Sequence, residues 1–484
     1  MFIDGLKEQL NESITENGAL GYATTGKALV DFNFKIASFR NMCDKDIIID
    51  FKNVWYENKE LALKYLFFAR DVREGLGERR LFRVCIKEVV DELDNRVFDW
   101  IKEFGRLDDI FVFDNTKLED DLYNFIKNQL TQDTINYQNK QPISLLAKWL
   151  PSINTSSEHT RDLAKKVCSK LDFNYKQYRK MLSTLRAYLK VTEVYCCANE
   201  WEQIDYSQVP SCANLKYKEA FLKHDKNRRE KYLESLQKGE TKINSSVVFP
   251  HNIVERYDIS KEDITLEEMW KALPNYVEGE SNTIVVRDGS GSMTWASNGT
   301  KPLIIATALS IYFGQRCKGQ FKDKFITFSE RPRLVAFSDY TKLKDIIRLC
   351  NRYAECANTN IEATFNLILR TAVENNLKQE EIPNLLIISD MEFDNATYGN
   401  VNKKLFNNIA ERFESYGYKL PKLTFWNVAS RTNTIPVVQN ELGVNLVSGF
   451  SPTVCKLVLS ESTDPYKALV QELTKERYKD ITLR

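Results

Sequence analysis

The spacing of apolar residues divides the chain into two unlike parts. Up to about residue 235 they recur at intervals of three and four, most clearly in 175–194, where Tyr178, Leu182 and Leu185 share one helical face. Beyond residue 282, short runs of β-branched and other apolar residues alternate with helical stretches. The pattern predicts a helical domain over 1–235, a bridging segment over 236–281 and an α/β domain over 282–484.

In the helical part, breaks in the periodicity mark the ends of helices. Two helices are predicted within 61–90, joined by a turn around Gly75, and helix pairs of this kind build α-solenoids. A single further helix is predicted over 214–236. Asp108 is a candidate cap for the helix that follows it, and Thr265 begins a capping-box pattern. We therefore expect stacked helix pairs, although no repeat fixes a solenoid period.

The second part has the alternation typical of a doubly wound α/β sheet. Helices are expected to separate most of its strands, so neighbouring strands should run parallel. The strands are predicted over 283–286, 321–327, 334–337, 384–389, 423–428 and 444–447, and the helices over 303–313, 343–350, 361–373, 405–416 and 465–473.

Polar side chains follow two of these strands. The first strand runs into Asp288, Ser290 and Ser292, and the strand over 384–389 ends at Asp390. Open α/β sheets bind ligands beyond the carboxyl ends of their strands, so we expect these side chains to converge. Their oxygen atoms suit Mg²⁺ or another hard divalent cation, although a loop of Ser, Gly and Asp also fits an ordinary turn. Because hydroxyl ligands are neutral, such a cation would keep positive charge that can attract a partner's carboxylate.

These segments resemble the von Willebrand factor A domain and its metal-ion-dependent adhesion site. The order is strand–Asp-x-Ser-x-Ser, then Thr359, then strand–Asp390, and the resemblance covers about 282–484. Two positions depart from the usual pattern, because Met391 and Asn358 stand where glycine is common; both should alter loop shape more than ligand chemistry. The resemblance implies three hydroxyl ligands and two carboxylates that act directly or through water: Ser290, Ser292, Thr359, Asp288 and Asp390.

The composition is that of an ordinary globular chain with two or more domains. Of 484 residues, 43% are hydrophobic and 28% charged, and the net charge of +1 means that any site for a polyanion must be a local patch. Ten scattered cysteines without a C-x-x-C pair and only three histidines favour reduced thiols in a cytoplasmic protein and disfavour a zinc site. With no signal-peptide pattern and no apolar run of about 18 residues, we expect no membrane span.

The helical part resembles a second family. The stretches 70–80, 105–109, 206–211 and 242–251 are similar to those of TROVE-module proteins, the Ro-type ribonucleoproteins, and of a related branch in viruses, phages and eukaryotes. The resemblance implies a ring or horseshoe of HEAT-like helix pairs, closed by the metal-site domain, that binds structured RNA or RNA ends. Basic residues interleaved with aromatics suit phosphate contact and base stacking, although charged helix faces are often merely solvated. The RNA-binding candidates are Arg70, Arg73, Arg79, Arg80, Lys216, Lys223, Arg228 and Arg229.

Three functions fit these observations. The first is a non-enzymatic RNA-binding scaffold whose Mg²⁺ site holds an acidic side chain of a protein partner. The second is a protein-interaction or assembly module, for example in a viral particle, that uses the same site without specific RNA binding. The third is a metal-dependent hydrolase using Asp288 and Asp390, which the absence of a histidine near either segment disfavours.

Overall fold

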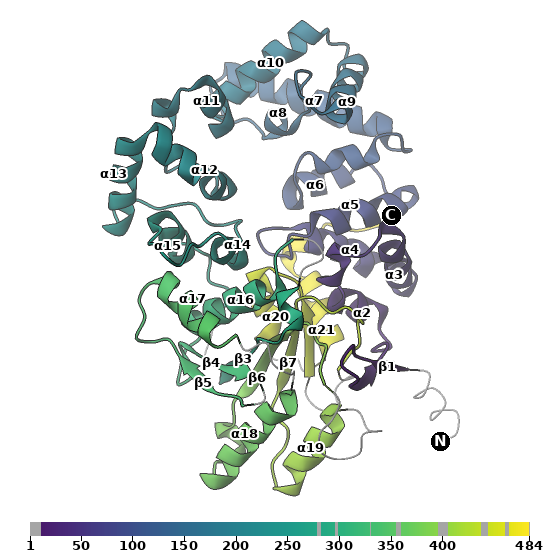
Figure 1. The fold of residues 1–484 in the computed structure, drawn as a ribbon. Helices are drawn as coiled ribbons and strands as arrows, with labels where there is room; N and C mark the ends of the chain where they lie inside the picture. The colour runs from purple at the N-terminus through teal and green to yellow at the C-terminus, as the bar shows by residue number, and fades with distance from the viewer. Residues whose placement is uncertain are drawn as a thin grey trace.

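The protein combines an N-terminal helical part with a C-terminal part built on a six-stranded, mostly parallel sheet. Figure 1 shows the N-terminal helical part above and the sheet below, with α18 and α19 at the bottom of the view. This computed structural model describes residues 11–277, 282–295, 299–329, 331–354, 360–394, 405–436, 444–459 and 464–483.

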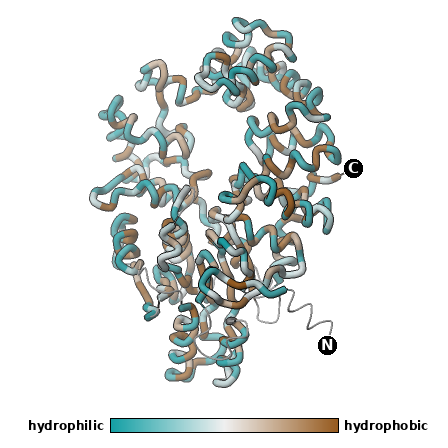
Figure 2. Tube along the Cα trace, turned by 45° about the vertical axis from the view of Figure 1, so that its right-hand side comes forward, coloured by the Kyte–Doolittle hydropathy of each residue, from teal (hydrophilic) through white to brown (hydrophobic). Residues whose placement is uncertain are grey.

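The helices follow an arc that leaves the sheet and returns to it (Figure 1). At one end of the arc, α4 packs against the C-terminal α21 (Pro465–Leu473); at the other, α14 packs against α16 (Pro302–Arg316). Hydrophobic and hydrophilic residues alternate along the helices of the arc, as Figure 2 shows. The α-helices before the sheet are α2 (Ala28–Phe34), α3 (Asp44–Glu57), α4 (Lys59–Arg70), α5 (Arg79–Glu88), α6 (Val97–Phe104), α7 (Glu119–Gln138), α8 (Leu146–Trp149), α9 (Glu158–Lys170), α10 (Tyr175–Tyr188), α11 (Thr192–Ala198), α12 (Ser211–His224), α13 (Lys226–Gln237), α14 (Pro250–Glu255) and α15 (Ile264–Lys271).

The helix pair predicted within 61–90 is present as α4 and α5, and the turn between them needs its glycine. A Cβ on Gly75 would lie 1.9 Å from the carbonyl oxygen of Phe68, so a larger residue would displace the turn. A buried ion pair fixes the same hairpin: the Nε atoms of Arg70 and Arg83 each lie 2.6 Å from the carboxylate of Asp109, which begins the short 3-10 helix η3 (Asp109–Phe113).

The sheet contains β3 (Thr283–Asp288), β4 (Lys324–Phe328), β5 (Leu334–Ala336), β6 (Asn384–Ser389), β7 (Leu423–Asn427) and β8 (Val444–Ser448). Their order is β5-β4-β3-β6-β7-β8, and all pairs are parallel except β4 with the short edge strand β5. This is the order of a doubly wound sheet, in which the chain winds outward from β3 in one direction and from β6 in the other. The switch point therefore lies between β3 and β6.

Alternate residues of the strands enter two separate hydrophobic cores. Val285 belongs to a large core that continues into the helical arc, whereas Ile284 and Val286 belong to a second core that also contains residues of α18 (Ile361–Glu374) and α19 (Leu405–Ser415). Since side chains of a strand alternate between its faces, the helices from α3 to α15 share their core with one face of the sheet only.

The first described residues are packed with the C-terminal part, which the sequence did not predict. A hairpin, β1 (Glu12–Ile14) with β2 (Leu20–Tyr22), pairs its Tyr22 with Ile435 through backbone hydrogen bonds of 2.9 Å in both directions. After it, α2 packs against β8, and its Val30 and Phe34 lie in the second core of the sheet. Residues far apart in the chain thus build one unit.

Several local expectations were wrong. The helix expected over 214–236 is two helices, α12 and α13, because Asp225 leaves the helical conformation with φ −141°. The cap of α15 is Asp263, whose side chain accepts from the N–H of Leu266, and Thr265 is its second residue. Asp108 precedes η3 but makes no capping hydrogen bond.

No helix in the described ranges is both long and apolar enough to cross a membrane. The cysteines within those ranges, Cys356 lying outside them, form no disulfide.

Candidate functional site

The two predicted carboxylates lie side by side at the switch point of the sheet. Strands β3 and β6 pair in parallel from Thr283 with Asn384 to Arg287 with Ile388, so both end at the same edge. Asp288 is the last residue of β3, and Asp390 directly follows the last residue of β6. This is the edge at which open α/β sheets bind ligands.

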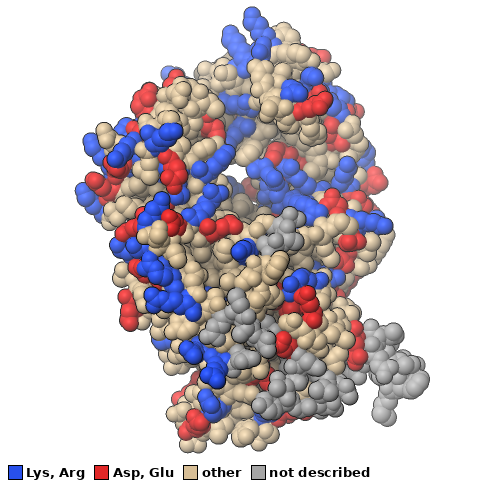
Figure 3. Space-filling model, in the orientation of Figure 1, with Lys and Arg blue, Asp and Glu red and all other residues tan. Residues whose placement is uncertain are grey.

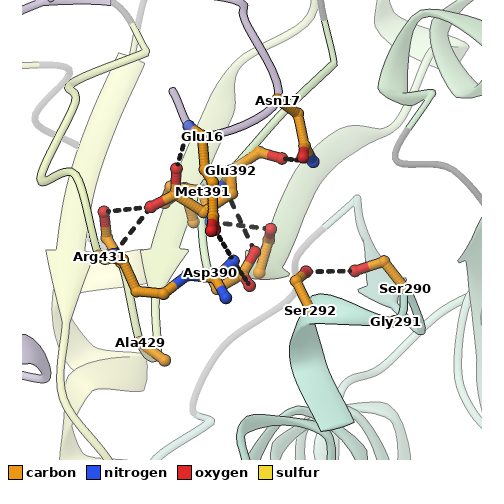
Figure 4. Close-up of polar contacts among 12 residues, drawn as sticks. Glu16, Asn17, Ser290, Gly291, Ser292, Asp390, Met391, Glu392, Ala429 and Arg431 are labelled. Carbon is orange, nitrogen blue, oxygen red and sulfur yellow. Dashed lines mark hydrogen bonds and ion pairs between the residues drawn. The ribbon is translucent and has the colours of Figure 1, made fainter. Parts of the chain in front are cut away.

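Asp288 is fully buried and held by hydrogen bonds from both strands' ends. The hydroxyl of Ser389 donates to its Oδ2 at 2.6 Å, and the backbone N–H of Ser290 donates to its Oδ1 at 2.9 Å. The Ser290 hydroxyl lies 2.9 Å from that of Ser292 (Figure 4), and Ser292 lies close enough to Asp390 to lower the pKa of its carboxyl group. The structure therefore brings four of the five predicted ligands together: Asp288, Ser290 and Ser292 form one hydrogen-bonded group, and Asp390 lies beside it.

Burial raises the pKa of both aspartates. For Asp288 the hydrogen bonds from Ser389 and Ser290 oppose this effect only in part. For Asp390, which is 1% exposed, burial is again the largest cause, and the charge of Asp288 raises the pKa further. The two carboxylates are thus costly to leave ionised without a positive charge between them.

The donor set fits a hard divalent cation. It consists of two carboxylates and two neutral hydroxyls, the oxygen ligands that Mg²⁺ takes together with water. The described residues contain no group of three or more His, Cys, Asp and Glu side chains placed to hold a metal, so a cation here would depend on hydroxyl and water oxygens for its remaining ligands. A cation would also relieve the repulsion between the carboxylates of Asp288 and Asp390, whose pKa values are both raised.

The sequence departs from the family pattern at two positions, Asn358 and Met391. Thr359 and Asn358 lie outside the described residues; their neighbour Asn360 caps α18 by accepting from the N–H of Ala363 at 3.0 Å. Met391 has φ +64°, so this methionine adopts the left-handed conformation for which glycine is usual. The loop after Asp390 therefore keeps that backbone conformation without the glycine.

A buried arginine lies next to Asp288 and makes no ion pair in the described part of the chain. Arg287 donates to the hydroxyl of Thr307 and to the carbonyl oxygens of Cys350 and Tyr353, each at 3.0 Å. These bonds connect β3 with α16 and with the end of α17 (Leu343–Arg352). Its charge also favours the ionised form of Asp288, although burial outweighs it.

Glu392 fastens the N-terminal hairpin beside the site. Its side chain is 0% exposed; Oε2 accepts from the N–H of Glu16 at 2.8 Å, and Oε1 accepts from the N–H groups of Arg431 and Thr432 at 2.7 and 2.9 Å. The Asn17 amide donates to the Glu392 carbonyl oxygen at 2.6 Å (Figure 4). The N–H groups of Glu16, Arg431 and Thr432 all donate to the side chain, which matches a carboxylate that only accepts.

The loop after β7 also brings a positively charged side chain, that of Arg431, to the site. Nη2 of Arg431 lies 2.5 Å from the carboxylate of Glu16 and 3.5 Å from Oδ2 of Asp390. Figure 4 shows this side chain extending from its loop toward Asp390. In front of it is a pocket of about 260 Å³ lined by Ala37, Arg40, Asn41, Ser292, Trp295, Gly299, Thr300, Pro302, Asp390, Val428, Ala429, Arg431 and Phe450.

The predicted RNA-binding residues fall into two groups. Arg70 is 5% exposed and paired with Asp109, and Arg229 is 0% exposed, with its guanidinium 5.0 Å from the ring centre of Tyr206. Neither is on the surface that phosphate can reach. The other six candidates are exposed: Arg73, Arg79, Arg80, Lys216, Lys223 and Arg228.

The exposed candidates are near or within α5 on one side of the arc and α12–α13 on the other (Figure 1). Figure 3 shows Lys and Arg side chains around the hollow that the arc encloses. Two of the candidates are already engaged, because Arg80 forms an ion pair with Asp44 and Arg228 forms one with Asp225 at 2.8 Å.

Sequence reasoning missed Glu16, Glu392 and Arg431. Glu392 stands two residues after a predicted ligand, which is the only local signal for any of the three. Glu16 and Arg431 are separated by more than four hundred residues, so only the fold brings them together.

Two family models match the chain. One, described as Domain of unknown function (DUF7788), matches residues 282–481; the other, Domain of unknown function (DUF2828), matches residues 15–89 and 117–287. Among curated proteins, "Uncharacterized protein L728" of Acanthamoeba polyphaga mimivirus is 30% identical over 516 residues, covering 96% of this chain and 87% of that protein.

Proposed function

Because this chain belongs to the DUF2828 family, whose description assigns no activity, we propose a function from its own geometry: a non-enzymatic RNA-binding scaffold with a Mg²⁺-dependent site for a partner's carboxylate. The observation that carries the proposal is the clustering of Asp288, Ser290, Ser292 and Asp390 at the switch point. It supports a von Willebrand factor A-type sheet domain, and the arc of helices supports a TROVE-like solenoid closed by that domain.

The metal part of the proposal rests on charge and ligand chemistry. Asp288 and Asp390 supply negative charge that burial makes unfavourable on its own, and the two serines supply neutral oxygens. A divalent cation held there would keep enough positive charge to bind one more carboxylate from outside. The pocket beside Asp390 gives such a side chain room to enter.

The metal site is tested by titrating the full-length protein with Mg²⁺ and Mn²⁺ in a calorimeter. Asp288→Asn and Asp390→Asn should each abolish binding of both ions. Asp133→Asn is the matched control, because Asp133 is an equally buried aspartate on α7 that accepts hydrogen bonds from Ser144. Wild-type protein that binds neither ion would refute this part of the proposal.

The RNA part rests on the exposed basic residues on the two sides of the arc. Arg73, Arg79 and Lys223 are exposed, and lysine or arginine near phosphate releases bound counterions, so RNA affinity should fall with salt. Replacing Arg73 and Arg79 by alanine should lower the slope of log affinity against log salt by roughly 0.7 for each phosphate that is no longer neutralised. Arg370→Ala on α18 is the control, since Arg370 is also exposed but lies outside the arc. An unchanged slope would remove these residues from the RNA surface.

The second candidate is an assembly module, favoured by the pocket that joins the site to the N-terminal segment. Affinity purification of wild type and of Asp288→Ala separates the two. RNA that remains when protein partners disappear supports the scaffold, whereas protein partners without RNA support the assembly module. Nuclease or phosphatase activity that disappears in Asp288→Ala would instead indicate a hydrolase.

A further inference from the structure

The pocket beside the candidate metal site has walls from two parts of the chain. Arg40 and Asn41 come from the N-terminal helical segment, while Asp390 and Arg431 come from the loops after β6 and β7. Asp390 is nearly inaccessible, whereas the Arg431 side chain is 42% exposed. An entering ligand would therefore meet Arg431 while approaching the buried carboxylate.

The backbone of Arg431 is held by a buried partner, whereas its guanidinium can exchange one partner for another. Its N–H is bound by the buried Glu392, but its guanidinium is held by Glu16, whose side chain is 54% exposed. Exposed ion pairs of this kind are weak, because water solvates both partners well. Both ionic contacts use Nη2, so among the described residues nothing hydrogen-bonds its Nε and Nη1 atoms.

The other arginine of the pocket differs in this respect. Arg40 is bound by Glu78 through two nitrogen atoms, Nε at 3.1 Å and Nη2 at 2.7 Å, and its guanidinium lies 3.9 Å from the ring centre of Phe450. The Glu78 side chain is only 9% exposed, so this pair is part of the pocket wall. Arg431 is thus the pocket cation that can accept a new partner.

We propose that Arg431 is a specificity-determining second anchor for the carboxylate of an acidic partner protein, and that Glu16 occupies Arg431 until this carboxylate arrives. The inference rests on the proposed function, since it places the first anchor at the cation between Asp288 and Asp390. A guanidinium presents paired N–H donors that match the two oxygens of a carboxylate. Both two-donor edges of a guanidinium include Nη2, the atom that Glu16 contacts, so Arg431 provides such an edge once Glu16 leaves it.

Removal of the Arg431 guanidinium should change the affinity for the metal and the affinity for the carboxylate in opposite directions. The guanidinium lies 3.5 Å from Asp390 and repels a cation bound there, so its removal should strengthen metal binding. Its removal should also weaken carboxylate binding, because one of the two anchors is then missing. A purely structural arginine would weaken both. Removal of Glu16 should free Arg431 and strengthen carboxylate binding.

The experiment uses the full-length protein with Mn²⁺ as the metal and acetate as the carboxylate. Calorimetry gives the Mn²⁺ affinity, and the relaxation of the acetate methyl protons by bound Mn²⁺ gives the acetate affinity. Arg431→Gln should bind Mn²⁺ roughly 3- to 10-fold more tightly and acetate more weakly by a similar factor. Glu16→Gln should bind acetate more tightly, and Arg370→Gln should match wild type.

The outcomes separate the second anchor from the metal site. Wild type that binds no Mn²⁺ refutes the proposed function and the anchor together. Mn²⁺ binding with acetate relaxation unchanged in Arg431→Gln, or with both affinities reduced, refutes the anchor alone. Preferential binding of inorganic phosphate over acetate would overturn the choice of a carboxylate.

Discussion

Replacing Glu392 by glutamine should release the N-terminal hairpin from the sheet. The two oxygens of Glu392 have different tasks: Oε1 accepts from Arg431 and Thr432, and Oε2 accepts from the N–H of Glu16. Glutamine keeps one acceptor oxygen, which the two N–H donors of the 430–432 loop will retain. Its NH₂ group must then face the N–H of Glu16, so a donor meets a donor.

The cost follows from the hydrogen bond that glutamine cannot make. A hydrogen bond to a charged acceptor contributes about 1.5–3 kcal/mol, and an unsatisfied buried N–H costs a comparable amount, so the hairpin should lose about 2–3 kcal/mol of local stability. This corresponds to a roughly 30- to 150-fold rise in the equilibrium constant for local opening. The Thr432 hydroxyl also lies 3.0 Å from Oε2 of Glu392.

Hydrogen exchange read by mass spectrometry measures this opening peptide by peptide. Exchange should accelerate within residues 11–23 and change less within 428–436. Glu267→Gln is the matched control, because Glu267 is also buried and accepts from two backbone N–H groups, those of Leu343 and Lys344, far from the hairpin. Equal exchange of residues 11–23 in Glu392→Gln and wild type would refute the assignment of Glu392 as the hairpin's anchor.

Three further predictions concern stability. Asp109→Ala leaves the buried Arg70 without its partner and should cost about 3–5 kcal/mol, seen as a lower melting temperature of the intact chain. Burial lowers the pKa of His251 to about 3, so below about pH 6.5 the unfolded chain gains a proton that the folded chain does not. The folded state should therefore lose about 3 kcal/mol of stability by pH 4. His251→Phe should reduce this loss in acid-unfolding curves, and an unchanged curve would contradict the assignment. Gly75→Ala forces a methyl group against the carbonyl oxygen of Phe68, so the melting temperature should fall, and a wild-type value would show that the turn can move.

The sheet part could be predicted closely because its signals are local. The boundaries of β6 and α21 agree with the sequence prediction to the residue, since each is an apolar or amphipathic run with a polar or proline boundary. Strand β4 begins at Lys324 and not at residue 321, because Asp323 adopts φ +56° and turns the chain just before it. The convergence of Asp288 and Asp390 follows from parallel pairing of two adjacent strands, which the alternation of elements already implied.

The remaining features depend on contacts between distant residues, which periodicity does not report. The break between α12 and α13 is an example: Asp225 accepts from the hydroxyl of Tyr206 at 2.9 Å and pairs with Arg228, and neither contact is visible in the helical pattern. Burial of Arg229 among aromatic rings likewise depends on the packing of separate helices. A basic residue on an amphipathic helix is usually solvated, so the sequence favoured the exposed alternative.

The hairpin and α2 tie the order of synthesis to the order of folding. Val30 and Phe34 are synthesised about four hundred residues before their core partners Phe425 and Leu446. Until β8 has been synthesised, this segment has no complete sheet on which to dock, and contacts of such long sequence separation form slowly. A fragment that starts at the first strand of the sheet should accordingly expose an apolar face and aggregate, unless residues 11–42 are supplied as a separate peptide.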